Sequence, residues 1–272
     1  MSNALAVSHG DFGRAAIYDL DRPITTHAHR EGHLIFSVAG GEATVKVCDT
    51  NVECNPGIAA AISPWELHSF EPRKTGFLNL VLYIKPMWFL EHTGSSDFAL
   101  NFGSREITLS DDIQLMVRKL TAMMIDESVD IRVENLLLEL TAKCYEVSWR
   151  GRSRPCSASQ LRSFSDFRVR RSQQLMKKYI YDHDGLDNLA CEVGLSRPHF
   201  FKLFKRQTGV TPNVYFNTLR SEQAIDDLMN TDKSVTDIAL DLGFASQASF
   251  TRFFSLNVGI APTDYRRVAR VS

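Results

Sequence analysis

Over the first third of the chain, apolar residues alternate with polar ones or gather in short runs. Between residues 15 and 85 the runs IYDL, HLIFSVAG, ATVKVCD, GIAAAISP and FLNLVLYI are separated by Gly, Pro, Asn and Asp. Short apolar or alternating runs bounded by turn residues are typical of β-strands. Because these runs recur about every 8 to 12 residues, the pattern predicts a barrel or a jelly roll.

Beyond residue 110 the apolar period becomes helical. In DDIQLMVRKLTAMMIDE the apolar positions fall on one face, at Ile113, Met116, Val117, Leu120, Met123 and Met124. A second helix is predicted from Asp130 to about Trp149, with apolar residues four and three apart at Val133, Leu137, Leu140, Cys144 and Val147. Such an a/d seam either packs on the predicted barrel or pairs with a second copy of the chain. A short strand is expected before these helices, near Glu106–Leu109.

The last third of the chain contains one pattern twice. Leu189–Tyr215 and Ile238–Tyr265 each have a short apolar segment, a glycine, a serine and a second apolar segment of helical period. A repeat of this kind indicates the architecture before local propensities are considered. Gly and Ser are typical of a helix end and a helix start, so two helix-turn-helix units are predicted. The equivalent pairs are Gly194 and Gly243, Ser196 and Ser246, Phe200 and Phe250, Phe204 and Phe254, Gly209 and Gly259, and Pro212 and Pro262.

In both repeats the second helix has an apolar stripe and an opposite face of basic, small and polar residues. Both copies carry a cation at the same outward position, Lys202 and Arg252. Such a face suits a DNA major groove, whereas the alternative is a pair of packed helical hairpins that bind no nucleic acid. The predicted DNA contacts are Arg197, Pro198, His199, Phe201, Lys202, Lys205, Arg206, Gln247, Ala248, Ser249, Thr251 and Arg252.

The segments around the repeats have their own signals. Thr211-Pro212 is typical of a helix start, and the helix that follows would hold the two units a fixed distance apart. Ser234 and Asp237 have the spacing of a capping box, and a last helix is expected from Pro262 to the arginines near Arg270. Gly151–Phe164, rich in Ser, Arg, Gly and Pro, is predicted to be a linker.

Composition narrows the class of protein. A length of 272 residues predicts two domains. No apolar run approaches the roughly 18 residues that span a bilayer, and the first residues lack the pattern of a signal peptide. From Arg150 onward, 19 Lys and Arg stand against 12 Asp and Glu, a net +7, whereas the preceding part has 12 against 20, a net −8. A basic half next to an acidic half fits a polyanion binder joined to a sensor.

Five cysteines, an odd number without a CxxC pair, are expected to be thiols in a reducing cytoplasm. They are Cys48, Cys54, Cys144, Cys156 and Cys191.

Four histidines lie in the predicted strand region. His27, His29 and His33 fall in HAHREGHLIF, and His68 follows in PGIAAAISPWELHSF. Imidazole ligands in this number would suit a divalent transition metal. The same residues could instead form polar walls of a pocket for an organic effector, with Trp65, Phe36 and Phe70 nearby, or they could be structural.

The second repeat, IALDLGFASQASFTRFFSLNVGIAPTDYRR, resembles the DNA-binding domain of AraC/XylS-type transcription regulators, and the resemblance extends over about the last 100 residues. The family usually has Lys or Arg in place of Ser255 and Thr in place of Ala261. The HxH and the later PG and Pro-x-x-x-His resemble the cupin half of the same family. Cupin metal sites include a Glu, and Glu31 follows His29 too closely for that pattern.

The resemblance implies an α+β chain with three parts. Residues 1–150 would be a cupin-like sensor and dimerisation domain, 151–167 a linker, and 168–272 a DNA-binding domain with two helix-turn-helix motifs. It implies a cytoplasmic, non-enzymatic, sequence-specific transcription regulator that reads successive major grooves about 34 Å apart. The implied partners are double-stranded DNA, RNA polymerase, a small-molecule effector or metal, and a second copy of the chain, with no membrane.

The resemblance implies no cofactor, and a divalent metal at the histidines is the one alternative left open. The rival hypotheses are a metal-dependent cupin enzyme with an appended helical domain, and an interaction module that binds no DNA.

Overall fold

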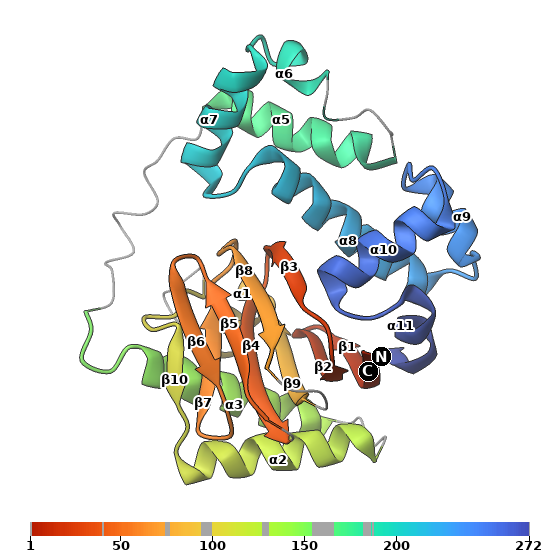
Figure 1. The fold of residues 1–272 in the computed structure, drawn as a ribbon. Helices are drawn as coiled ribbons and strands as arrows, with labels where there is room; N and C mark the ends of the chain where they lie inside the picture. Colours follow the sequence, from red (N-terminus) through yellow and green to blue (C-terminus); the bar gives the residue numbers. More distant parts are fainter. Residues whose placement is uncertain are drawn as a thin grey trace. The chain divides into compact units, whose positions relative to one another are not determined.

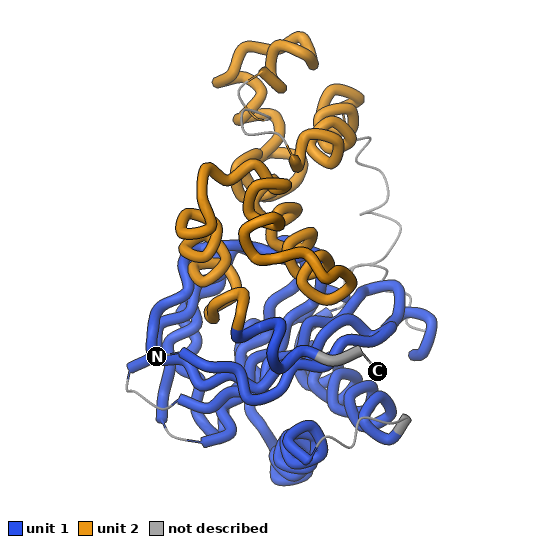
Figure 2. Tube along the Cα trace, turned by 90° about the vertical axis from the view of Figure 1, so that its right-hand side faces the viewer, with its two compact units in different colours: residues 1–157, 264–272 blue, residues 158–263 orange. Residues whose placement is uncertain are grey.

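The computed structural model describes residues 2–39, 41–73, 77–93, 100–126, 131–153, 166–181, 186 and 188–271. The chain divides into two compact units, residues 1–157 together with 264–272, and residues 158–263, which Figure 2 shows in different colours. The predicted linker lies mostly outside the described residues, as does Cys156, and the other four cysteines are free thiols. None of the described helices has the length and apolar character needed to cross a bilayer.

The first unit is built on two β-sheets (Figure 1). The seven-stranded sheet has the order β10-β7-β4-β9-β2-β1-β11 and the four-stranded sheet the order β3-β8-β5-β6. The strands are β1 Asn3–Gly10, β2 Gly13–Leu20, β3 Ile24–His27, β4 Gly32–Ala39, β5 Ala43–Val47, β6 Thr50–Cys54, β7 Ile58–Ile62, β8 His68–Pro72, β9 Phe77–Ile84, β10 Glu106–Thr108 and β11 Ala269–Val271. The α+β class is confirmed, although the two sheets are separate and the predicted barrel is not closed.

Among the described residues before the linker, the helices of this unit are α1 Pro86–Thr93, α2 Asp111–Ile125 and α3 Ile131–Ser148. Ile113 and Leu120 of α2 are buried in one core with Leu137 and Leu140 of α3, and Phe36 of β4 belongs to the same core. Because the a/d seam of α3 is buried on its own sheet, the first of the two readings of that seam is confirmed.

The end of the chain completes the seven-stranded sheet. α11, Pro262–Val268, is followed by β11, which pairs with β1 in the parallel direction. The Tyr265 hydroxyl accepts a hydrogen bond from Arg14 Nη1 at 3.2 Å and lies 2.8 Å from His9 Nε2. The expected last helix therefore ends at Val268, and Arg270 lies in a strand that the sequence pattern did not indicate.

The second unit is helical. Its elements are α5 Phe167–Lys178, the short 3-10 helix η1 Tyr179–Tyr181, α6 Leu189–Glu192, α7 Arg197–Thr208, α8 Pro212–Asn230, α9 Val235–Asp241 and α10 Gln247–Val258. Gly194 and Gly243 take φ of +71° and +74° in the two turns, a backbone conformation that L side chains rarely adopt. Both predicted helix-turn-helix units, α6–α7 and α9–α10, are therefore present.

Candidate nucleic-acid interface and histidine cluster

The second helix of each helix-turn-helix unit, α7 or α10, is held by phenylalanines on its inner face. Phe200 and Phe204 of α7 are fully buried with ring centroids 5.6 Å apart, and Phe204 meets Tyr215 of α8 at 5.4 Å. Phe250 and Phe254 of α10 are fully buried at 5.8 Å. This burial fixes the rotation of each helix and thereby decides which residues face outward.

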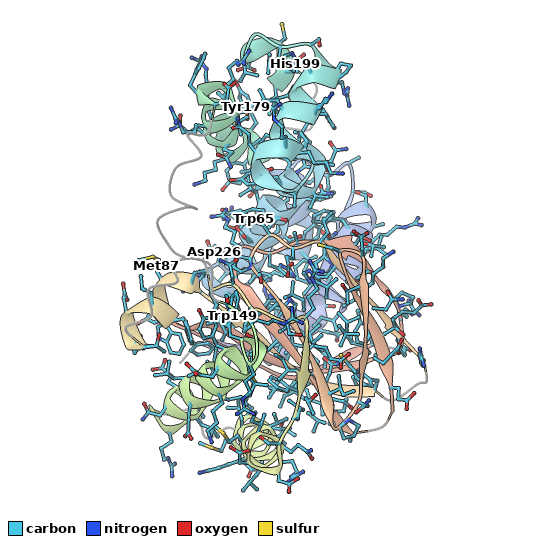
Figure 3. All side chains as sticks on the ribbon, turned by 90° about the vertical axis from the view of Figure 1, so that its left-hand side faces the viewer. Trp65, Met87, Trp149, Tyr179, His199 and Asp226 are labelled. Carbon is cyan, nitrogen blue, oxygen red and sulfur yellow. The ribbon has the colours of Figure 1, made fainter. Side chains whose placement is uncertain are left out.

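All twelve predicted DNA contacts lie on α7 or α10 at positions open to solvent. Phe201 and Thr251 are half-buried, on the flank of each helix, and the others are exposed, including His199, which Figure 3 labels. Their role in DNA binding remains a prediction. The exposed residues are Arg197, Pro198, His199, Lys202, Lys205, Arg206, Gln247, Ala248, Ser249 and Arg252.

The two faces differ in charge. The exposed face of α7 carries four cations, Arg197, Lys202, Lys205 and Arg206, whereas that of α10 carries Arg252 among small and polar residues. Cations set affinity for the phosphate backbone, while base contacts need close approach of short side chains and a well-placed donor. The α7 face therefore offers more cations for phosphate, and the α10 face more short side chains that permit close approach.

Caps and local contacts fix several of these side chains. Ser246 and Ser249 form a capping box at the start of α10, and Ser249 Oγ also donates to the Ser246 carbonyl at 2.7 Å. Thr236 Oγ1 donates to Gln247 Oε1 at 2.7 Å, so a residue of α9 orients the first residue of α10. The Arg197 guanidinium lies over the Phe201 ring at 5.6 Å. The sequence repeat did not indicate Thr236, because the pattern relates positions within each copy and not contacts between helices.

α8 connects the two helix-turn-helix units. It has 19 residues, which corresponds to a length of about 28 Å. Thr211 caps its start by accepting from Val214 N at 3.3 Å, with Pro212 at the first helical position as predicted. Near its middle, the Arg220 guanidinium lies 4.8 Å from the Phe216 ring and 5.0 Å from that of Phe244 in the second turn. Arg220 thus links α8 to the second helix-turn-helix unit, a contact that sequence reasoning missed.

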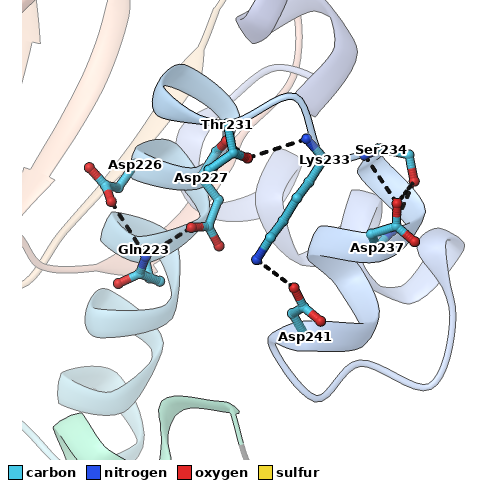
Figure 4. Close-up of polar contacts among 8 residues, drawn as sticks. All are labelled: Gln223, Asp226, Asp227, Thr231, Lys233, Ser234, Asp237 and Asp241. Atoms are coloured by element: carbon cyan, nitrogen blue, oxygen red, sulfur yellow. Dashed lines mark hydrogen bonds and ion pairs between the residues drawn. The ribbon is translucent and has the colours of Figure 1, made fainter.

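Polar contacts hold the segment between α8 and α9 against α9 (Figure 4). Lys233 Nζ lies 2.7 Å from Asp241 Oδ2 at the far end of α9. Ser234 and Asp237 form the predicted capping box, in which Ser234 N donates to the carboxylate at 3.2 Å and Asp237 N donates to the serine hydroxyl at 3.1 Å. These contacts define where the second helix-turn-helix unit begins relative to α8.

The four predicted histidines of the first unit lie together between the two sheets. His27 of β3 is opposite His68 of β8, with ring centroids 4.3 Å apart. His33 of β4 lies 5.0 Å from His68 and 5.3 Å from His29, again between centroids. One ligand nitrogen each of His27, His29 and His68 lies within 4.8 Å of the others. The antiparallel pairing of β3 with β8 therefore brings His27 and His68 together, although about forty residues separate them in the sequence.

Burial controls the charge of this cluster. Removal from water lowers the pKa of His27 to about 3 and that of His68 to about 4, and it lowers the pKa values of His29 and His33 well below the usual value. Neighbouring imidazoles add to the effect for His27, His29 and His33. The four rings are consequently neutral at pH 7, and each offers a lone pair.

The aromatic residues near the histidines have different surroundings. Trp65 lies in the turn before β8, and its backbone N donates to the His29 carbonyl at 2.8 Å. Phe36 belongs to the core formed with α2 and α3, because residues 33 and 36 of a strand point to opposite faces. Phe70 contacts Phe77 at 5.6 Å. Glu31 is half-buried and is not part of the ligand group.

Comparison with known proteins agrees with the repeat. Residues 189–268 match the family model described as a helix-turn-helix domain. A protein of Staphylococcus aureus strain MSSA476, named an uncharacterized HTH-type transcriptional regulator, is 27% identical over 242 residues, which are 86% of this chain and 31% of that protein. This chain thus spans about a third of the length of such relatives. A protein of Photobacterium leiognathi, named "Probable transcriptional regulator LumQ", is 26% identical over 255 residues, 91% of this chain and 94% of that protein.

Among solved structures, ToxT from Vibrio cholerae strain SCE256 with an unsaturated fatty acid bound has a TM-score of 0.58 at 14% identity, covering 98% of this chain and 95% of that one. At this identity the match supports the fold.

Proposed function

We propose that this chain, whose last third is a helix-turn-helix domain of the AraC/XylS type, is a sequence-specific DNA-binding transcription regulator. The observation that carries the proposal is the duplicated unit with two exposed faces, each centred on a cation, Lys202 in α7 and Arg252 in α10. Buried phenylalanines behind both helices leave these faces open to a double helix. The work of the protein in this proposal is binding, and none of its residues acts as a catalyst.

The two helices read successive major grooves on one side of double-stranded DNA. Such grooves are about 34 Å apart. α8 is about 28 Å long, so it can hold α7 and α10 apart by a similar distance. Arg252 contacts a guanine edge, since a guanidinium group can donate two hydrogen bonds to guanine O6 and N7. Lys202 contacts guanine or phosphate, and Phe201 meets a thymine methyl. Arg197, Lys205 and Arg206 bind phosphates and set the register.

The first unit serves as the sensor in this proposal. Residues 1–150 form the cupin-like sensor and dimerisation domain, 151–167 the linker and 168–272 the DNA-binding domain, with Ala269–Val271 paired to β1 of the sensor sheet. The homodimer uses α2, whose outer face exposes Leu115 at 61% and Ile125 at 47%. RNA polymerase is the protein partner through which binding changes transcription, and the protein is cytoplasmic.

An effector bound in the sensor shifts the dimer between two DNA-binding arrangements. Support comes from the structural neighbour ToxT, which has been solved with an unsaturated fatty acid bound, and from the group of polar residues enclosed between the two sheets here. For this chain the occupant is a small molecule or a metal ion.

A second function, metal-dependent catalysis by the cupin-like unit, is favoured only by the histidine cluster. It would require turnover that depends on added metal and that His68→Ala abolishes. DNA selection separates the two functions, because an enzyme with an appended helical domain would enrich no sequence.

The test of the regulator is selection of binding sites from random double-stranded DNA by the full chain at 150 mM salt, followed by titration of the selected site. A site with two half-sites about one helical turn apart is expected. Equal affinity for the selected and the scrambled duplex would refute sequence-specific binding.

A further inference from the structure

The hydrogen bonds of the histidines between the sheets are those expected of metal ligands. His27 Nδ1 lies 2.6 Å from the Thr25 carbonyl and His68 Nδ1 lies 2.9 Å from the Glu66 carbonyl. A carbonyl only accepts, so each Nδ1 carries the hydrogen and each Nε2 carries the lone pair. A backbone carbonyl on the remote nitrogen is the usual orientation of a metal-binding histidine.

Other nitrogens of the cluster are buried without a hydrogen-bond partner. They are His29 Nε2, His68 Nε2 and both ring nitrogens of His33. Buried polar atoms in proteins are nearly always paired with protein, water or an ion. Unpaired imidazole nitrogens in one region therefore require an explanation, and a shared ion supplies it for His29 Nε2 and His68 Nε2 together.

We propose that His27, His29 and His68 bind a divalent transition-metal ion of the Zn²⁺ type, with His33 beside the remaining coordination position. Three nitrogens at the mutual limit of 4.8 Å would place a common centre about 2.8 Å from each, against about 2.0–2.1 Å in zinc sites. For four-coordinate geometry each nitrogen needs to move inward by about 0.8 Å or less, which is a side-chain adjustment. An all-nitrogen set selects Zn²⁺, Co²⁺, Ni²⁺ or Cu²⁺ over Mg²⁺ and Ca²⁺.

The charges around the site indicate what completes it. The three ligands are neutral imidazoles, and no carboxylate of the described residues belongs to the group. The nearest buried cation is Arg14, which lies 3.6 Å over the ring of Tyr83, itself 4.2 Å from His33. Because none of the described carboxylates belongs to the ligand group, an exogenous anion such as hydroxide, chloride or a carboxylate would complete the coordination.

The site would make a metal ion, or a metal with a chelating anion, the signal that the proposed regulator senses. The assignment of the site itself does not rest on DNA binding. Metal binding is measured without DNA, so a failure of one proposal is distinguishable from a failure of the other.

The experiment titrates the full chain, freed of metal with a chelator and dialysed, with Zn²⁺ by calorimetry and with Co²⁺ by visible absorption. One equivalent is expected, with the intense Co²⁺ bands of a four- or five-coordinate site. His68→Gln should weaken Zn²⁺ binding at least about 100-fold, since losing even an outer partner costs 10–100-fold. His92→Gln is the matched control, because His92 is exposed at the end of α1, outside the cluster.

His29→Cys keeps the proposal testable where His68→Gln fails to fold. It replaces one nitrogen with a thiolate and should give a near-ultraviolet sulfur-to-Co²⁺ charge-transfer band with one equivalent of Co²⁺. Absence of stoichiometric Zn²⁺ binding by the wild-type chain would overturn the assignment. So would equal affinity in folded His68→Gln and wild type, or Co²⁺ bound by His29→Cys without that band.

Discussion

Ser246 and Ser249 exchange two hydrogen bonds across the first turn of α10: Ser249 N donates to Ser246 Oγ at 3.2 Å, and Ser246 N donates to Ser249 Oγ at 3.2 Å. Ser196, the equivalent residue before α7, stands at the N-cap position but makes no cap hydrogen bond through its side chain. The two copies of the repeat therefore differ in how α7 and α10 begin, although the sequence has a serine at both positions.

This difference predicts unequal effects of two matched substitutions. Ser246→Ala should lower the free energy of unfolding of the helical unit by about 1 kcal/mol, the usual cost of a lost N-cap. Ser196→Ala removes no cap bond and should cost less than about 0.5 kcal/mol. Urea unfolding followed by circular dichroism measures both. Equal losses would mean that the Ser196 hydroxyl caps α7 in solution.

Removal of the Arg252 side chain should alter which sequence is bound. Arg252→Ala is expected to cost about 1–3 kcal/mol on the selected DNA site and to relax the preference at one base pair, because a two-pronged guanine contact is lost. Fluorescence anisotropy with the selected site and its single-base variants measures this. Arg22→Ala is the control, since Arg22 belongs to the other unit and its side chain is 73% exposed. A uniform loss over all duplexes would reassign Arg252 to phosphate.

A cation of α7 should behave differently. Lys205→Ala removes an exposed charge and should weaken binding to all duplexes alike, while reducing the slope of log affinity against log salt by about 0.9. Titrations between 50 and 200 mM salt, on selected and scrambled DNA, give both quantities in one series, with Arg22→Ala again as control. A change confined to one base pair, with the salt slope intact, would contradict the phosphate role.

The Arg220 guanidinium between Phe216 and Phe244 predicts a coupling between α8 and the second helix-turn-helix unit. Arg220→Gln should lower stability by about 1 kcal/mol through loss of the two cation–ring contacts. It should also weaken DNA binding more than stability alone explains, because the spacing of the two recognition helices loosens. Hydrogen exchange of α9 and α10 tests this, with Gln223→Ala on the same helix as the comparison. Unchanged exchange in α9 and α10 would rule the coupling out.

The repeat was predictable because it depends on local signals. Gly194, Gly243, Thr211-Pro212 and the Ser234 box each act through backbone conformation or through a bond within four residues, and the structure has them where the pattern indicates. Arg220 and Thr236 were not predictable in this way, since their partners Phe244 and Gln247 lie eleven or more residues away. Such contacts depend on how helices cross, which periodicity does not specify.

In the first unit the predictable part was the apolar strands. Four further strands, β1, β3, β6 and β8, carry mixed residues such as TNVEC and HSFEP, whose weak alternation gives little signal. His27 and His29 were recognised as a pair, but their meeting with His68 follows from the register that puts residue 27 opposite residue 68. Strand β11 is three residues long and has no pattern of its own, because its stability comes from β1.

His9 gives the first unit a dependence on pH. Burial, together with the positive charges of Arg14 and Lys85, lowers the pKa of His9 to about 3. The His9 ring nitrogen Nε2 lies 2.8 Å from the Tyr265 hydroxyl. An unfolded histidine titrates near 6.5, so between about pH 6.5 and pH 3 the unfolded state binds the extra proton. The contribution of His9 to the free energy of unfolding is therefore fully present above pH 6.5. It falls as the pH is lowered, by at most about 1.4 kcal/mol per pH unit.

His9→Gln isolates that contribution. Glutamine retains a polar partner for the Tyr265 hydroxyl but does not titrate, so the loss of stability between pH 6.5 and pH 4 should be shallower in the variant than in the wild type. Urea unfolding at a series of pH values, followed by tyrosine and tryptophan fluorescence, measures the two slopes. His92→Gln, at an exposed position, should leave the wild-type slope unchanged. If His9→Gln and wild type lose stability in parallel, folding does not lower the pKa of His9, and the predicted pH dependence is wrong.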